Sequence, residues 1–446
     1  MRARIDNLKR KALGAGLGGF LVRAMAGSGA VQAAGMLATF LVGVQLARGL
    51  GVQGYGQYGI AMAVIALVSI PGEFGIPKLV TREVAAASAR GDLPRLFGVL
   101  RWAKRMTLRV ALPLAAVIAI GSWLMARHSD SAVAGAIAVG ALLVPLVAIS
   151  KIQGGALQGL RFVVLGQIPF HLLRPFLLSA LLFGLFLLRP DASPADAMAL
   201  NLVTALAALL LGHSLLRARL PTARPAETIE DRRAWRASSI PMAMSEGLRI
   251  LQPQIGVLLL GVLATDADAG LFRVAVATAA VVAVPLTLGN LIAAPIIARL
   301  HAEGDQRRLQ LLCTHTAQAM AAGVLALGLP LVIAGPWLVG LIFGIEFEPA
   351  YAALLLLCAG QFITGLFGAN IVLLNMIGHE GRVTRAMGVA LAVNVGLALV
   401  LLPLWGATGA AAAFTASLIV WNLTMWGDAR KLAAIETSIV APRGGR

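Results

Sequence analysis

Long apolar stretches alternate with short polar connections along the whole chain. A helix needs about 20 mostly apolar residues to cross the hydrocarbon core of a membrane, and twelve stretches of roughly that length are present. Strands of a membrane barrel would instead alternate apolar and polar residues over about ten positions, a pattern that the sequence lacks. We therefore predict an all-α integral membrane protein with twelve transmembrane helices. The approximate bounds of the stretches are 28–48, 57–78, 107–126, 132–150, 163–188, 197–217, 239–264, 271–294, 315–335, 350–374, 384–405 and 408–428.

The composition supports this prediction. Of the 446 residues, 59% are hydrophobic and only 13% are charged, whereas soluble proteins carry about a quarter of charged residues. The 49 glycines suit closely packed transmembrane helices, because small residues let two backbones approach. Two cysteines, Cys313 and Cys358, indicate neither a disulfide framework nor a metal site.

The positive charges are distributed unevenly between the two sides of the membrane. A net charge of +17 could indicate a nucleic-acid partner. With the N-terminus placed in the cytoplasm, however, most Lys and Arg residues fall in cytoplasmic connections, above all in 78–109 and 218–238. The positive-inside rule explains this bias. We predict that both termini are cytoplasmic, that membrane lipids are partners and that nucleic acid is not. The basic residues assigned to the outer side are Arg48, Arg127, Arg189 and Arg273.

An internal repeat divides the chain into two halves. Residues 56–75 match residues 270–289 at a constant offset of 214. Each copy holds six apolar stretches, so both start on the same side of the membrane and form a parallel repeat. We predict two six-helix lobes in a V-shaped transporter. The predicted divisions are an N-terminal lobe over 1–217 with an interfacial helix over 1–27, a cytoplasmic linker over 218–238, a C-terminal lobe over 239–428 and a cytoplasmic tail over 429–446.

Two prolines, Pro71 and Pro285, occupy matching positions in the two copies. Proline kinks a transmembrane helix and frees a backbone carbonyl. The pair is a candidate for hinges that move, with a purely structural bend as the alternative.

Arg174 is the foremost candidate for a binding residue among the charges inside predicted spans. An ionisable residue in a span normally faces the bundle interior or an aqueous cavity. Arg174 has no carboxylate nearby in the sequence, and His171 precedes it by three positions. We predict that both line a cavity, together with Arg249 and the amide of Gln254.

Glu73 and Glu246 are the carboxylates of the predicted spans. Glu246 and Arg249 are three residues apart on one helix, so the two either neutralise each other or serve a substrate. Glu73 lies toward the inner end of its span, where it would pair with Lys78 or Arg82. The alternative for both carboxylates is the binding of a coupling ion, H⁺ or Na⁺. No other cofactor and no metal is expected.

Enzyme signatures are absent from the sequence. It contains no HExxH, GxSxG or Walker motif. The outer connections 127–131, 189–196, 265–270 and 406–407 are too short for an external active site. We predict a transporter in which two lobes rock about a central cavity.

Short motifs along the chain resemble those of the bacterial polysaccharide flippases of the Wzx type. The segments 46–58, 74–83 and 335–350 are similar to three connections of that family. The closing pair of helices is similar too, through Asn394, Pro403 and the glycines and alanines of 406–413. The resemblance covers nearly the whole chain, with motifs that are mostly structural.

The resemblance implies membership of the multidrug/oligosaccharidyl-lipid/polysaccharide exporter superfamily and a place in the bacterial inner membrane. It also implies a substrate, an undecaprenyl-pyrophosphate-linked oligosaccharide moved from the cytoplasmic to the periplasmic leaflet, and a polysaccharide polymerase as a possible partner. Guanidinium groups bind phosphate through a fork of two donors, which makes Arg174 and Arg249 the expected pyrophosphate ligands. The alternatives are an ion-coupled drug exporter of the same superfamily, although the first span lacks a carboxylate, and a membrane-embedded glycan ligase or polymerase.

Overall fold

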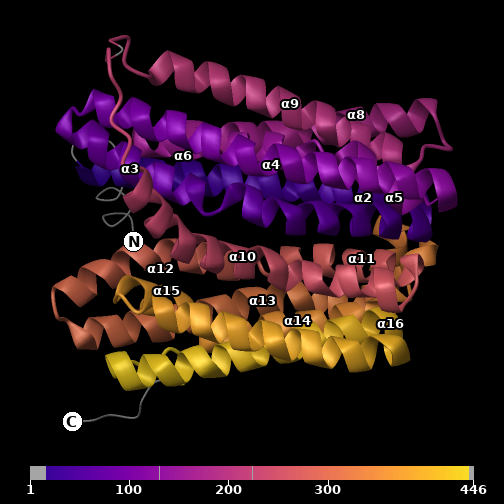
Figure 1. Cartoon of the computed structure of the whole chain (residues 1–446). Coiled ribbons are helices and arrows are strands. Elements are labelled where there is room, and N and C mark those ends of the chain that lie inside the picture. Colours follow the sequence, from indigo (N-terminus) through magenta and orange to yellow (C-terminus); the bar gives the residue numbers. More distant parts are fainter. Residues whose placement is uncertain (1–16, 130, 224, 441–446) are drawn as a thin grey trace.

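A computed structural model describes residues 17–129, 131–223 and 225–440, which fold almost entirely into helices (Figure 1). Residues 1–16 of the predicted interfacial helix and 441–446 of the predicted tail lie outside the described residues. The all-α membrane fold is confirmed. Ten helical stretches are long and apolar enough to span a membrane, and two of these are double-length stretches that each hold two of the predicted spans, which accounts for twelve.

The first lobe contains the first six spans. Its helices are α2 (Leu17–Glu73), α3 (Ile76–Arg90), α4 (Leu93–Ser129), α5 (Ala132–Gly140), α6 (Leu143–Gly159), α7 (Val163–Gln167), the π-helix η1 (Ile168–Leu173), α8 (Arg174–Leu188) and α9 (Pro194–Arg219).

The second lobe contains the other six. Its helices are α10 (Arg232–Leu263), α11 (Asp266–Val282), α12 (Val284–Ala302), α13 (Gln306–Phe343), the short 3₁₀ helix η2 (Ile345–Phe347), α14 (Ala350–Phe367), α15 (Asn370–Met376) and α16 (Glu380–Ala433). In Figure 1 the indigo-to-magenta helices form one layer and the rose-to-yellow helices the other.

Glycines mark the sharp bends inside the two longest helices. Gly51 divides α2 with φ 67° and ψ −179°, and Gly406 divides α16 with φ 49° and ψ −127°. A Cβ makes such backbone conformations very unfavourable. Each bend therefore joins two antiparallel spans without an intervening loop. Both bends lie at the end of the molecule opposite the linker, which we call the far end.

The two lobes meet at the far end through residues that the repeat relates. A Cβ on Gly56 would lie 1.7 Å from the carbonyl oxygen of Asp266, and a Cβ on Gly270 would lie 2.2 Å from that of Val52. Gly56 and Gly270 are 214 residues apart, as are Val52 and Asp266. The contact is thus symmetric, as expected for parallel repeats related by an axis along the membrane normal.

Further polar contacts join the lobes at the same end. Arg48 donates from Nε to the carbonyl oxygen of Ile342 over 2.8 Å and also reaches the carbonyl oxygen of Leu341. Gln57 donates to a carboxylate oxygen of Asp266 over 3.0 Å. At the opposite end, where the linker lies, α3 of the first lobe and α12 of the second are apart (Figure 1), but α3 contacts α10, since a Cβ on Gly75 would lie 2.6 Å from the backbone nitrogen of Ala243.

The linker between the lobes comprises residues 220–231, because α9 continues to Arg219 and α10 begins at Arg232. It lies against α4 of the first lobe. The amide of Ile229 donates to the carbonyl oxygen of Pro94 over 3.2 Å. A Cβ on Gly98 would lie only 2.0 Å from the carbonyl oxygen of Ile229, so glycine is required where the linker crosses the helix.

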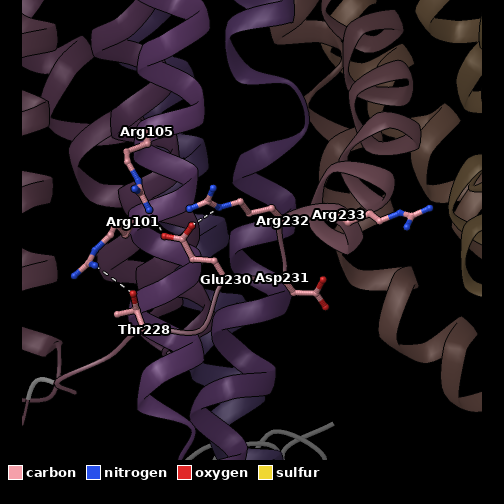
Figure 2. A pocket seen from close by; sticks show the side chains of 7 residues that line it. All are labelled: Arg101, Arg105, Thr228, Glu230, Asp231, Arg232 and Arg233. Carbon is pink, nitrogen blue, oxygen red and sulfur yellow. Dashed lines mark hydrogen bonds and ion pairs between the residues drawn. The ribbon is translucent and has the colours of Figure 1, made fainter.

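Arginines of α4 and α10 fix the linker in place. Arg101 donates to Thr228 over 3.2 Å, while Arg105 of α4 and Arg232 of α10 both bind the carboxylate of Glu230 (Figure 2).

Trp235, in the first turn of α10, is buried with Trp102, and their ring centroids are 5.4 Å apart. Both belong to a hydrophobic cluster that is otherwise made of first-lobe residues. The start of α10 is therefore packed into the first lobe, although the rest of the helix contributes to the second.

Candidate functional site

A π-helix leads directly into Arg174, a half-buried charge of the first lobe. The six residues Ile168–Leu173 form η1, and α8 begins directly afterwards at Arg174. Segments of π-helix are rare and occur frequently at functional sites. A Cβ on Gly35 of α2 would lie 2.1 Å from the carbonyl oxygen of His171. The first span therefore packs directly on the π-helix and holds its wide turn in position.

Arg174 is half-buried and is bound by neutral groups. Its guanidinium donates to Oδ1 of Asn201 over 3.0 Å, and Asn201 donates in turn to the Tyr58 hydroxyl over 2.8 Å. The guanidinium also lies over the ring of Phe170, 5.1 Å from its centroid. No described carboxylate forms an ion pair with Arg174. Its positive charge thus remains available to an anionic ligand, with several of its five donors unused.

A second arginine approaches this group from the other lobe. Arg273 of α11 lies over the ring of Tyr55, at 5.2 Å, and also faces the ring of Tyr58, at 5.9 Å. Gly59 makes room for it, because a Cβ there would lie 2.0 Å from Cδ of Arg273. Arg273 is the eighth residue of α11 and packs against the first lobe, and its place on the outer side stays a prediction. The signal that could have identified this contact is the repeat, since Gly59 is the counterpart of Arg273 at the offset of 214.

The buried carboxylate of Glu73 has a different partner from the two expected. Lys151 of α6 forms an ion pair with it over 2.6 Å, and the Glu73 side chain is only 5% exposed. Neither Lys78 nor Arg82 reaches Glu73, because α2 ends at Glu73 and the chain turns through left-handed conformations at 74 and 75. The Lys151 ammonium also lies 5.8 Å from the centroid of the Phe170 ring, so it links Glu73 to the surroundings of Arg174.

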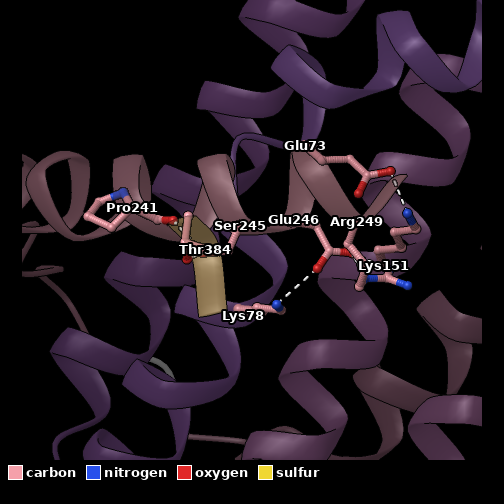
Figure 3. A network of polar contacts seen from close by, with 8 residues as sticks. All are labelled: Glu73, Lys78, Lys151, Pro241, Ser245, Glu246, Arg249 and Thr384. Atoms are coloured by element: carbon pink, nitrogen blue, oxygen red, sulfur yellow. Dashed lines mark hydrogen bonds and ion pairs between the residues drawn. The ribbon is translucent and has the colours of Figure 1, made fainter. Parts of the chain in front are cut away.

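Glu246 joins the two lobes. Lys78 of α3 approaches its carboxylate to 2.9 Å, and Arg249 binds the other oxygen from one turn along α10 (Figure 3). The expected contact between Glu246 and Arg249 is therefore present, with Lys78 as an additional partner. The Arg249 side chain is 62% exposed. Since an exposed charge at this depth of a span needs water or a ligand, Arg249 faces an aqueous space.

These residues form one electrostatic group. The charges of Lys151 and Arg249 both act on His171, and the charge of Glu73 acts on Arg249. Three cations (Lys78, Lys151 and Arg249) thus surround two carboxylates (Glu73 and Glu246), before Arg174 is included. The group as a whole is positive, and we call it the interlobe cluster.

Gln254 lies five residues beyond Arg249 in α10, half-buried and without a hydrogen bond to any described residue. Gln254 is therefore not one of the residues that form the interlobe cluster. Among the described residues, no group of His, Cys, Asp or Glu side chains could hold a metal ion.

The two matched prolines both lie at helix breaks. Pro71 is in the last turn of α2, three residues before Phe74 with its φ of 43°. Pro285 is the second residue of α12, which follows the end of α11 across Ala283. Both positions therefore lie at breaks in corresponding spans, and Glu73 is two residues beyond the first of them.

A family model described as "Polysaccharide biosynthesis protein" matches residues 21–301, more than half of the chain. No curated protein sequence matches. Among solved structures, a multidrug resistance MATE family transporter of the MOP superfamily in an inward-facing conformation is similar, with a TM-score of 0.73, 14% identity and coverage of 90% of this chain and 95% of the other.

Another similar structure is the lipid II flippase MurJ in an inward closed conformation. It has a TM-score of 0.68 and 13% identity, with coverage of 89% of this chain and 86% of the other. At this level of identity the likeness concerns the fold, and it agrees with the two-lobed architecture predicted from the repeat.

Proposed function

The chain belongs to the polysaccharide biosynthesis protein family, and from this membership we propose that it flips an undecaprenyl-pyrophosphate-linked oligosaccharide across the bacterial inner membrane. The direction is from the cytoplasmic to the periplasmic leaflet, with both termini in the cytoplasm. The family and the similar structures are transporters and flippases rather than enzymes. The flipped unit would then reach a polysaccharide polymerase as the next partner.

The observation that carries the proposal is the excess of positive charge between the lobes. A lipid-linked pyrophosphate is the most strongly charged part of such a substrate, and its transfer through hydrocarbon is very costly without a cation. Arg174 has no carboxylate partner among the described residues, and Arg249 shares one with Lys78 while remaining exposed. Both guanidinium groups therefore have donors that can bind phosphate oxygens.

The remaining parts of the substrate need different surroundings. The amides of Asn201 and Gln254 can donate to and accept from sugar hydroxyls, and His171 adds a ring nitrogen nearby. We assign the isoprenoid tail to the lipid between the lobes at the linker end. There α3 and α12 lie apart in Figure 1, although α3 contacts α10 through Lys78 and Glu246, while the glycine contact keeps the far end closed.

A coupling ion would act on Glu73 or Glu246. Each carboxylate is bound by cations in this conformation: Glu73 by Lys151, and Glu246 by Lys78 and Arg249. Binding of H⁺ or Na⁺ to either carboxylate would weaken these ion pairs. The cations would then be free for the pyrophosphate, and the contact between Lys78 and Glu246 would no longer hold the lobes together. The membrane potential supplies about 2.3 kcal/mol per charge per 100 mV to such a step.

The first experiment is a deletion in the native host, with lipid extracts analysed for undecaprenyl-pyrophosphate-linked oligosaccharide. We expect accumulation of the complete repeat unit in the cytoplasmic leaflet and loss of surface polymer. Sensitivity to cationic dyes without any accumulated lipid-linked glycan would refute the proposal in favour of a drug exporter. Accumulation of unpolymerised glycan on the periplasmic side would instead indicate a polymerase.

Variants test the residues in the complemented strain. Arg174→Ala should abolish surface polymer while the protein remains folded and inserted, and Arg249→Lys should reduce it because an ammonium lacks the fork of two donors. Arg189→Ala is the matched control, since Arg189 is an exposed arginine in the connection between α8 and α9. Normal polymer with Arg174→Ala would remove Arg174 from the site.

A further inference from the structure

A groove of about 610 Å³ runs along the outside of the first lobe, between α4, α6 and α9. It shares no lining residue with the interlobe cluster. Most of its wall is apolar, with leucines on each side that follow one another at helical spacing. Those used below are Leu108 and Leu112 of α4, Leu146 of α6, and Leu206 and Leu210 of α9.

One end of the groove is polar and positively charged. Lys104 lies one turn before Leu108 in α4, and His213 lies one turn after Leu209 in α9. Both residues are exposed. The chain enters α4 and leaves α9 at the linker end, so the two side chains are at the same end of the groove.

Lys104 differs from its neighbours on the same helix. Arg101 and Arg105 are engaged by Thr228 and Glu230 of the linker (Figure 2). In the part of the chain that the structure describes, Lys104 forms no ion pair. Its ammonium is therefore available to an external anion.

Gln153 of α6 forms part of the wall of the groove. It lines the groove and is only 7% exposed, yet its Oε1 has no hydrogen-bond partner among the described residues. A Cβ on Gly212 would lie 2.6 Å from this oxygen, so the amide is held closely against α9. This oxygen is covered by the protein and faces Gly212, so it is not a contact for a ligand in the groove.

The depth of the polar end in the membrane identifies the type of ligand. Lys104 precedes the predicted third span by three residues, and His213 lies four residues before the predicted end of the sixth. These positions correspond to the level of the lipid head groups. From Lys104 to Leu112 the groove extends about 12 Å along the helix axis, at about 1.5 Å per residue, into the level of the acyl chains.

We propose that this groove binds one anionic phospholipid of the surrounding leaflet. The phosphate contacts the Lys104 ammonium and an N–H of the His213 ring, which donates in either tautomer, and one acyl chain lies against the leucines. The charge of the polar end suits a single phosphate. This site is separate from the proposed substrate site, where the pyrophosphate is assigned to Arg174 and Arg249, and it does not depend on that proposal.

Native mass spectrometry of the full-length chain in detergent tests the headgroup contact. The protein is incubated with equal amounts of phosphatidylglycerol and phosphatidylcholine, and the bound lipids are counted. One cation near an anionic lipid raises the affinity about fivefold. For one bound lipid molecule per protein, wild type should therefore prefer phosphatidylglycerol to phosphatidylcholine. Lys104→Ala should lower that preference by about fivefold. The double variant Lys104→Ala/His213→Ala should abolish it, and Lys104→Arg should keep it.

The matched control is Lys431→Ala, which removes an exposed lysine from the last turn of α16 in the other lobe. It should leave the preference unchanged. An unchanged preference in the double variant, an equal loss in the control, or no preference in wild type would overturn the proposal.

A second measurement tests the acyl contact. Leu206→Trp fills the groove and should remove one bound lipid of either type, whereas glycerol phosphate without acyl chains should displace none. Displacement by glycerol phosphate would show a site for free phosphate instead, and unchanged lipid counts in Leu206→Trp would show that the groove is not occupied. In each case the protein must elute as the same species as wild type, so that a folding defect is recognised.

Discussion

The glycine contact at the far end predicts how the equilibrium between conformations responds to a single methyl group. Gly56→Ala would place a Cβ 1.7 Å from the carbonyl oxygen of Asp266, and Gly270→Ala would place one 2.2 Å from that of Val52. Real Cβ contacts are essentially never shorter than 3.0 Å, so the lobes must separate locally by about 1 Å. Neither neighbour can rotate away, because both are backbone atoms of a helix.

The cost can be estimated from overpacked interiors. Inserting a methyl group into a well-packed contact typically costs about 1–3 kcal/mol, and about 1.4 kcal/mol corresponds to a factor of ten. The conformation with the far end closed should therefore lose about five- to 150-fold in population relative to one with the far end open. A closed-to-open ratio of about 100 would fall to between about 20 and about 1.

Distances between spin labels across the far end measure this shift. One label at Asp191 follows α8 in the first lobe, and one at Trp405, which is 60% exposed, lies beside the bend of α16 in the second. The buried native cysteines are replaced beforehand. Gly56→Ala and Gly270→Ala should both add a longer distance to the distribution.

The control is Gly184→Ala, because a Cβ on Gly184 of α8 meets nothing within 4 Å. It should reproduce the wild-type distribution. Wild-type distances in both interface variants would refute the argument that these glycines hold the far end closed. A shift in only one of the two would refute the symmetric contact, since the repeat makes the positions equivalent.

Three further predictions concern residues at or near the linker end. Lys78→Glu should reduce transport by breaking the ion pair between the lobes, and adding Glu246→Lys should restore part of it; no restoration in the complementation assay would refute a pairwise role. Trp235→Ala should lower stability by about 3–5 kcal/mol, seen as a lower Tm in detergent; an unchanged Tm would show that the start of α10 is not anchored. Gly35→Ala should impair transport with normal membrane insertion, because its Cβ would lie 2.1 Å from the carbonyl oxygen of His171; normal polymer would show that the π-helix tolerates displacement.

Periodicity and length sufficed to predict the spans, because each crossing requires an apolar stretch that few other structures need. The repeat then predicted the two parallel lobes. What the pattern could not show is where two spans form one bent helix. Gly51 and Gly406 allow this through backbone conformations that depend on the neighbouring helices, and a glycine in the sequence is equally compatible with a simple loop.

For the charged residues too, contacts between near neighbours in the sequence could be predicted and contacts between distant residues could not. The contact between Glu246 and Arg249 follows from a spacing of three on one helix, and it is present. The partner of Glu73 is 78 residues away in the sequence, and no spacing rule selects Lys151. The contact of Arg273 with Tyr55 and Tyr58 is not local either, because only the packing of α11 on α2 brings these side chains together.

The contacts of the linker, and not the hydropathy pattern, show where the first lobe ends and the second begins. A polar segment with two prolines suggests a flexible connection, yet residues 225–231 and Trp235 are fixed to the first lobe by backbone, ionic and aromatic contacts. If the lobes rock, the first turn of α10 must then stay with the first lobe while the rest of the helix follows the second. Pro241 lies between Trp235 and Glu246, and α10 still contacts the first lobe beyond it, since Lys78 approaches Glu246 and a Cβ on Gly247 would lie 3.0 Å from Ile70. Motion between the lobes would thus have to break the contact between Lys78 and Glu246 and slide the rest of α10 along α2.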